Sequence, residues 1–87
     1  MNIQARVVST HQGHKGDGQQ ILDAGLNIND IVDVDKIDMG GSYTTITLKG
    51  HKGYFNSVNF EFLENGKMLD IYQDKRFFSN DYFISSQ

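Results

Sequence analysis

The stretch Ile37–Tyr72 constrains the fold most, because it is a succession of short β-type segments separated by glycine-containing turns. Threonine, aliphatic and aromatic residues dominate these segments, and Lys49–Gly53 interrupts them. Asn65-Gly66 lies between two apolar runs, and Asn-Gly is the strongest short-range hairpin signal because both central residues of the turn need a positive φ. We therefore expect an all-β domain with a hairpin between strands over Phe60–Leu63 and Met68–Tyr72.

Similar patterns predict the remaining elements. Apolar and acidic residues alternate in a second strand, which places Val32 and Val34 on one face. Asp17 is suited to cap a short helix, and Gly25 to end it in the left-handed conformation. In chain order we expect a strand over Ala5–Thr10, a loop over His11–Gly18, a helix over Gly18–Ala24, a strand over Asn29–Asp38, a turn at Gly40-Gly41 and a strand over Thr44–Leu48.

The length of 87 residues indicates one domain over 1–87, made of a barrel at about 3–72 and an aromatic tail at 73–87. A chain this short builds one thin core. We expect Ile46, Phe55, Val58 and Phe60 in that core, with Val32 and Val34 facing them. There is no cysteine, which excludes a disulfide framework and fits a reducing compartment.

Charge and hydropathy limit the partners. Residues 1–6 lack the basic-then-apolar pattern of a signal peptide, and no apolar run approaches the ~20 residues that cross a bilayer. The net charge is −3, and Lys49 and Lys52 are too few for the basic stripe of a nucleic-acid binder. We expect a soluble cytoplasmic protein that binds neither membrane nor nucleic acid.

Five short strands in so small a chain favour a barrel, which removes exposed sheet edges. The segment Gly53-Tyr-Phe-Asn-Ser57, followed by an apolar strand, resembles the Gly-x-Phe-Pro-Ser signature of SH3 domains. The chain is similar to the small SH3-like β-barrel proteins common among phage and prophage genes. This resemblance covers about residues 3–63 and implies a 3₁₀ turn before the last barrel strand.

The departures from the SH3 pattern concern its ligand groove. Asn56 stands at the proline position, Asn59 stands where SH3 domains carry a tyrosine, and the chain has no tryptophan. In SH3 domains these positions bind polyproline ligands. The resemblance therefore implies the scaffold without the proline-motif activity.

His11, His14 and His51 are candidate metal ligands, since imidazole binds zinc, copper and nickel. No cysteine or glutamate cluster completes a set of four ligands. We expect solvated loop residues, with no metal and no cofactor. The glycine-rich segment Gly13–Gly18 could cradle a phosphate at the helix start. It matches no established phosphate-binding motif, so a flexible connection is the favoured interpretation.

The aspartates of the second strand form the densest charge cluster, and either a solvated strand face or an acidic contact face accounts for it. Catalytic groups are scarce. Ser42 and Ser57 have no recognisable His–Asp partners, and Glu61 and Glu64 have no second acidic residue in a different environment with which to form an acid/base pair. We expect that the protein is not an enzyme. The residues of the possible acidic contact face are Asp30, Asp33, Asp35 and Asp38.

The tail over 73–87 combines polar residues with large aromatics, which are enriched with arginine at interface hot spots. It either caps the barrel or captures a partner, and we favour an added strand on the chain's own sheet together with weak dimerisation. The predicted partner-binding residues are Arg76, Phe77, Phe78, Tyr82, Phe83 and Tyr54.

These observations favour a non-catalytic binding module. The phage-like resemblance implies an accessory protein that binds and inhibits or modulates a host protein, including one of a defence pathway, in the host cytoplasm. A homo-oligomeric sponge for a nucleotide signal is the alternative, and a small enzyme acting on such a ligand is the third. An exposed aromatic patch favours the first; a pocket with converging Arg, Lys and backbone donors favours the second.

Overall fold

The computed structural model describes residues 2–40, 43–77 and 81–83, and it confirms a small all-β fold with little helix. The 3₁₀ turn implied by the SH3 resemblance lies directly before the fifth strand. The elements are β1 (Ile3–Val7), α1 (Asp17–Asp23), β2 (Ile31–Met39), β3 (Thr44–Leu48), β4 (Phe55–Asn56), η1 (Ser57–Asn59), β5 (Phe60–Glu64), β6 (Lys67–Leu69), η2 (Lys75–Phe77) and β7 (Asp81–Phe83).

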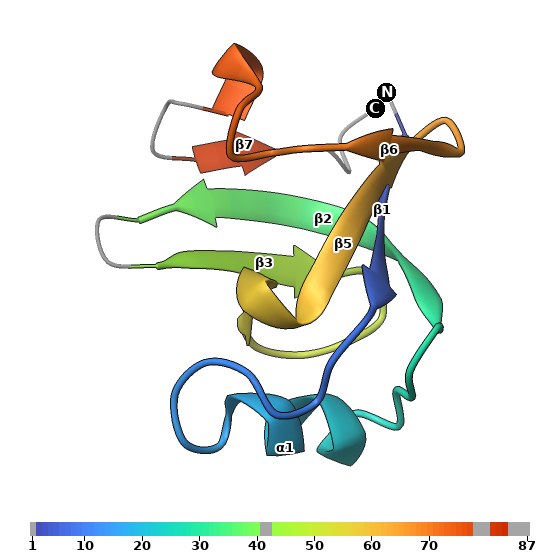
Figure 1. Ribbon diagram of the computed structural model, residues 1–87, viewed down its shortest axis with the longest axis vertical. Helices are drawn as coiled ribbons and strands as arrows, with labels where there is room; N and C mark the ends of the chain where they lie inside the picture. The colour runs from blue at the N-terminus through green and yellow to red at the C-terminus, as the bar shows by residue number, and fades with distance from the viewer. Residues whose placement is uncertain (1, 41–42, 78–80, 84–87) are drawn as a thin grey trace.

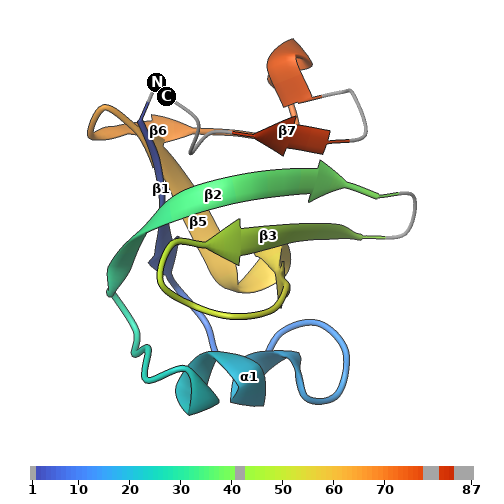
Figure 2. The same cartoon turned by 180° about the vertical axis from the view of Figure 1, so that it is seen from behind.

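The strands pair antiparallel in the order β4-β3-β2-β1-β5-β6. They form two layers, since β1 and β5 run across β2 and β3 in both views (Figures 1 and 2). The first residues of β2 pair with β1, whereas Lys36–Asp38 pair with β7. β7 thus extends the sheet at β2 beyond the β1 pairing, so the described tail strand joins its own chain, as favoured from the sequence.

The hydrogen-bonded path is open rather than closed into a barrel, because β4 and β6 are its two ends. Closure was expected to remove the exposed edges. β4 has only two residues, since the 3₁₀ turn η1 begins at Ser57. Other elements cover the core instead: α1 lies across one end of the two layers and η2 at the other (Figure 1). Ile21 of α1 and Phe77 of η2 are both fully buried.

The hairpin at Asn65-Gly66 is confirmed. Both residues have positive φ, 53° and 82°, and Phe62 pairs with Leu69 across the turn. β6 is shorter than the predicted Met68–Tyr72 because the chain turns at Asp70. The Asp70 carboxylate accepts a hydrogen bond from the Tyr72 amide at 3.0 Å, and this local bond replaces the strand pairing.

The predicted helix is also present, with a different start. Gly16, at φ 93°, occupies the N-cap position, so the prediction that Asp17 caps the helix was wrong. At the other end Gly25 has φ 81°, as predicted. The Leu26 amide donates to the Ile21 carbonyl, and the Gly25 amide donates to the carbonyl of Leu22; together these bonds form a Schellman motif.

The bounds of the first two strands differ from the prediction, and β2 spans Ile31–Met39 rather than Asn29–Asp38. β1 begins at Ile3, which pairs with Glu64, and ends at Val7 rather than Thr10. In β2 the register shifts between Val34 and Lys36, which is a β-bulge at the intervening residue. Burial therefore passes from Val34 to Ile37 instead of following a strict period of two.

The core contains Ile46, Phe55, Phe60 and Val34, as predicted, and Val32 packs against it partly buried. Val58 was wrongly assigned to it. The tight turn η1 rotates successive side chains by about 120°. The first and last residues of the turn, Ser57 and Asn59, are consequently buried, while Val58 between them is 45% exposed.

Replacing Phe60 by alanine tests this core. The Phe60 ring is 6% exposed and meets Phe55 edge-on with centroids 6.2 Å apart. We expect a loss of about 3–5 kcal/mol in the free energy of unfolding, measured by urea denaturation. Val58→Ala is the matched control and should change it by less than about 1 kcal/mol, since its side chain is half in water. Equal losses in both variants would contradict this assignment.

Candidate functional site

Exposed apolar side chains gather where η1 meets the segment that follows β6. Tyr43, Val58 and Tyr72 are 51%, 45% and 48% exposed. They line a hollow of about 400 Å³. We call the residues around this hollow the η1 surface. Its members are Gly40, Tyr43, Thr44, Asn56, Ser57, Val58 and Tyr72.

Three polar side chains of the η1 surface form hydrogen bonds within the chain. The hydroxyl oxygens of Ser57 and Tyr72 lie 2.6 Å apart. The Asn56 Oδ1 accepts from the Val58 amide at 3.1 Å, and its Nδ2 donates to the Asp17 carboxylate at 3.0 Å. What the η1 surface offers a ligand is therefore mainly aromatic and aliphatic area.

Asn56 and Asn59, the two departures from the SH3 signature, both fix the loop between β1 and α1. Asn59 is fully buried, and its side chain accepts from the Gln12 amide at 3.0 Å and donates to the Gln12 carbonyl at 3.2 Å. The Asp17 carboxylate joins the Asn56 side chain to the His14 amide, which donates to it at 2.7 Å. Both asparagines therefore have a structural role here.

The histidines lie apart from any metal-binding arrangement in the described residues. His14 meets the Tyr43 ring edge-on at 5.3 Å, which places it at the rim of the η1 surface. His11 is 3.3 Å from the Ser9 hydroxyl, and His51 lies in the turn after β3. Among residues 2–40, 43–77 and 81–83 no three His, Asp or Glu side chains are grouped to hold a metal ion. The expectation of no metal stays a prediction.

The glycine-rich segment Gly13–Gly18 packs against the chain after β1. A Cβ on Gly18 would lie 1.7 Å from the Thr10 carbonyl oxygen, so only glycine permits this approach. The Asp17 carboxylate already accepts the His14 amide at the start of the helix. A carboxylate in that position repels a phosphate, and the segment acts as a connection.

The four predicted acidic contacts have different environments. Asp30 closes a turn by accepting the Asn27 amide at 2.8 Å, and Asp33 accepts from the Gln4 side chain at 3.1 Å. Lys36 lies on the same strand between the last two members and places a positive charge among them. Their role as a contact face stays a prediction. These residues are Asp30, Asp33, Asp35 and Asp38.

The predicted partner-binding residues of the tail are divided. Phe77 is fully buried in the core, so in this structure it cannot contact a partner. Phe78 lies outside the described residues, as do the side chains of Tyr82 and Phe83. Tyr54 is 56% exposed, with the Lys36 ammonium 5.8 Å from its ring centroid. Of these positions, Tyr54 and Arg76 lie at the surface, and their contact with a partner stays a prediction.

Sequence reasoning missed Tyr43 and Tyr72 as surface aromatics and placed Val58 in the core. The 3₁₀ turn implied by the SH3 signature could have predicted that Val58 is exposed, because the neighbours of Val58 in the turn face inward. Neither tyrosine has a sequence signal of this kind, since their proximity arises from contacts between distant segments.

Three of the catalytic candidates are paired with other groups, and the fourth, Ser42, lies outside the described residues. The Ser57 hydroxyl faces Tyr72 rather than a histidine. Glu61 forms an ion pair with Arg6, and Glu64 forms one with Arg76. These contacts account for the serine and both carboxylates without assigning them chemistry.

Comparison with known proteins gives one match. A family model described as bacteriophage T4 protein Y07B matches residues 2–83. The chain belongs to this family. The match supports the predicted phage origin, and it does not identify the chain as an SH3 domain. No curated protein and no solved structure matches the chain. Within the described residues, no helix of the phage protein is long and apolar enough to span a membrane.

Arg76 holds the tail of the phage protein against the hairpin. Its guanidinium donates to Glu64 at 2.7 and 2.9 Å and to Asp74 at 2.7 Å. These hydrogen bonds hold the pKa values of both carboxyl groups below their ordinary range and raise the pKa of Arg76. The cluster precedes buried Phe77 and fixes where the chain leaves the surface.

Arg76→Gln tests this cluster through pH. Because the pKa values of Glu64 and Asp74 are depressed in the folded state, their contribution is complete above the unfolded values near 4 and is lost as pH falls through the folded values. We expect the variant to melt a few degrees below the parent at pH 7, with the difference shrinking below about pH 4. Lys49→Gln, which removes an exposed charge elsewhere, should show no such convergence. A difference independent of pH would refute the ionic origin.

Proposed function

We propose that this phage protein is a non-catalytic binding module that binds a host protein through the η1 surface and modulates or inhibits it. Exposed Tyr43, Val58 and Tyr72 around one hollow are the observation that carries the proposal. Tyrosine is among the residues enriched at hot spots of protein interfaces, and a concave patch of such residues accepts a protruding side chain.

The host target is inferred from the phage family. Because we infer an accessory protein made during infection, we place its action in the host cytoplasm and include host defence proteins among the targets. The asparagines that replace the proline and tyrosine of the SH3 signature favour a ligand other than a proline-rich peptide. Their side chains are committed to Gln12 and Asp17.

A nucleotide sponge is less well supported. Of the described hollows, the one between α1 and the turn after β3 carries Lys52 and His51, but Asp23 faces the same space. Phosphate recognition needs converging cationic groups and backbone donors. A single lysine beside a carboxylate is a poor phosphate site.

Retention of host proteins by the immobilised full chain tests the proposal. We expect a specific protein to be retained from a lysate of the host bacterium by the parent, and Tyr43→Ala to weaken its binding about 30-fold. That factor corresponds to the ~2 kcal/mol typical of a hot-spot aromatic. Dissociation constants would be measured with the purified partner.

Leu22→Ala is the matched control, because Leu22 is 44% exposed on α1, away from the η1 surface. It should bind like the parent, and thermal melting should confirm that both variants are folded. The proposal fails if the parent retains no host protein, or if both variants bind equally well.

A further inference from the structure

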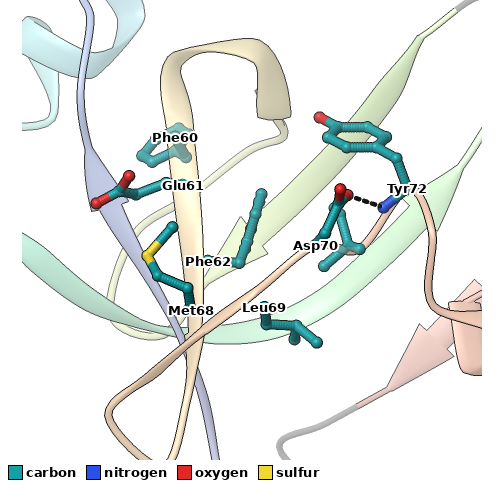
Figure 3. Close-up of a pocket in the computed structure, with 8 residues that line it drawn as sticks. Phe60, Glu61, Phe62, Met68, Leu69, Asp70 and Tyr72 are labelled. Carbon is teal, nitrogen blue, oxygen red and sulfur yellow. Dashed lines mark hydrogen bonds between the residues drawn. The ribbon is translucent and has the colours of Figure 1, made fainter.

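A second groove lies on the other side of Tyr72. Beyond the Asn65-Gly66 hairpin, β5 separates from the segment that follows β6, and the space between them measures about 350 Å³ (Figure 3). Its apolar lining is Phe60, Phe62, Met68, Leu69, Ile71 and Tyr72. We call this space the β5–β6 groove. Tyr72 lines both this groove and the η1 surface, so the two hollows adjoin.

The β5–β6 groove has a buried floor and an exposed apolar rim. Ile71 is fully buried and Phe62 is 2% exposed, so the floor belongs to the core. Met68, in contrast, is 66% exposed, a high value for a large apolar side chain on a strand. The free energy of burying this rim is thus available to a ligand.

The groove also lies at the less protected end of the sheet. At the other end, α1 covers β4: the Gln20 side chain donates to the Tyr54 carbonyl at 2.6 Å and the Asn56 side chain donates to Asp17. β6 ends the strand order with no further strand beside it in the described chain. An extended segment can lie along such an end.

The charges of the groove select the partner. Among the described residues, the charged side chains that line it are the carboxylates Glu61 and Asp70, and no Lys or Arg lines it. Glu61 points to the β1 side, where Arg6 pairs with it. Asp70 is exposed and accepts one hydrogen bond, from the Tyr72 amide. The groove therefore combines an apolar rim with a solvent-facing negative charge.

We propose that the β5–β6 groove binds an extended segment of the host partner in which an aliphatic side chain is flanked by Lys or Arg. The aliphatic side chain covers Met68 and enters the groove beside Tyr72, and the cation pairs with Asp70. This inference rests on the proposed function and adds to it the chemistry that the partner must carry.

Three labelled seven-residue peptides serve as probes: one alternates lysine and leucine, one alternates glutamate and leucine, and one alternates lysine and serine. They are titrated into the ¹⁵N-labelled full chain. We expect only the lysine–leucine peptide to shift amide signals of residues 60–62 and 68–72. Equal binding of the lysine–serine peptide would overturn the apolar part of the proposal, and equal binding of the glutamate–leucine peptide would overturn the ionic part.

Asp70→Asn is the decisive variant, because an asparagine oxygen can still accept the Tyr72 amide while the charge is lost. It should weaken binding of the lysine–leucine peptide about two- to fivefold, as expected for an exposed ion pair. Met68→Ser should weaken it about fivefold through lost apolar contact. The controls are Asp23→Asn and Ile28→Ser, which change an exposed acid and an exposed apolar residue elsewhere.

Both groove variants are then tested against the retained host protein. If Tyr43→Ala weakens the binding of that protein and the two groove variants do not, this inference fails and the proposed function stands. If no host protein is retained while the lysine–leucine peptide still binds the groove, the proposed function fails. Shifts confined to other elements, or equal effects of the control variants, would also overturn the groove assignment.

Discussion

The buried amide of Asn59 is the contact on which the rest of the structure depends. Its side chain bonds both backbone groups of Gln12, and its own carbonyl accepts the amides of Val8 and Ser9. One residue thus fastens the end of η1 to the chain leaving β1. Because a buried amide left without partners costs about 1–3 kcal/mol, these bonds are mutually required. They set the path of the loop that leads to α1, and α1 in turn covers β4.

Features that depend on local sequence were predicted well, and features that depend on contacts between distant segments were not. The Asn65-Gly66 turn and the glycine that ends α1 depend on backbone preferences of one or two residues, which sequence alone reveals. The bulge after Val34 has no such signal, since it arises from pairing with β3. Burial of Phe77 likewise depends on the tail returning to the core, so an aromatic that looked available for a partner proved structural.

The candidate site shows the same division. The SH3 signature located η1. Its departures at Asn56 and Asn59 predicted a scaffold without the proline-motif activity; in the structure both side chains bond the loop between β1 and α1, and the loss of that activity stays a prediction. It could not indicate that Tyr43 and Tyr72, from distant segments, would stand on either side of Val58. Tyr72 connects the η1 surface to the β5–β6 groove, so one side chain borders an aromatic hollow and an acidic, apolar one. A ligand crossing Tyr72 would contact both.

The pairing of β1 has a consequence for the order in which the chain folds. Hairpins β2–β3 and β5–β6 join neighbouring segments, whereas β1 pairs with β5, so that Ile3 lies opposite Glu64. Closing so long a loop is entropically costly before the contacts it creates are made, and folds of high contact order fold in milliseconds to seconds. We therefore expect docking of β1 between the two hairpins to be the slow step, and until it occurs the apolar faces of both hairpins are open to other chains.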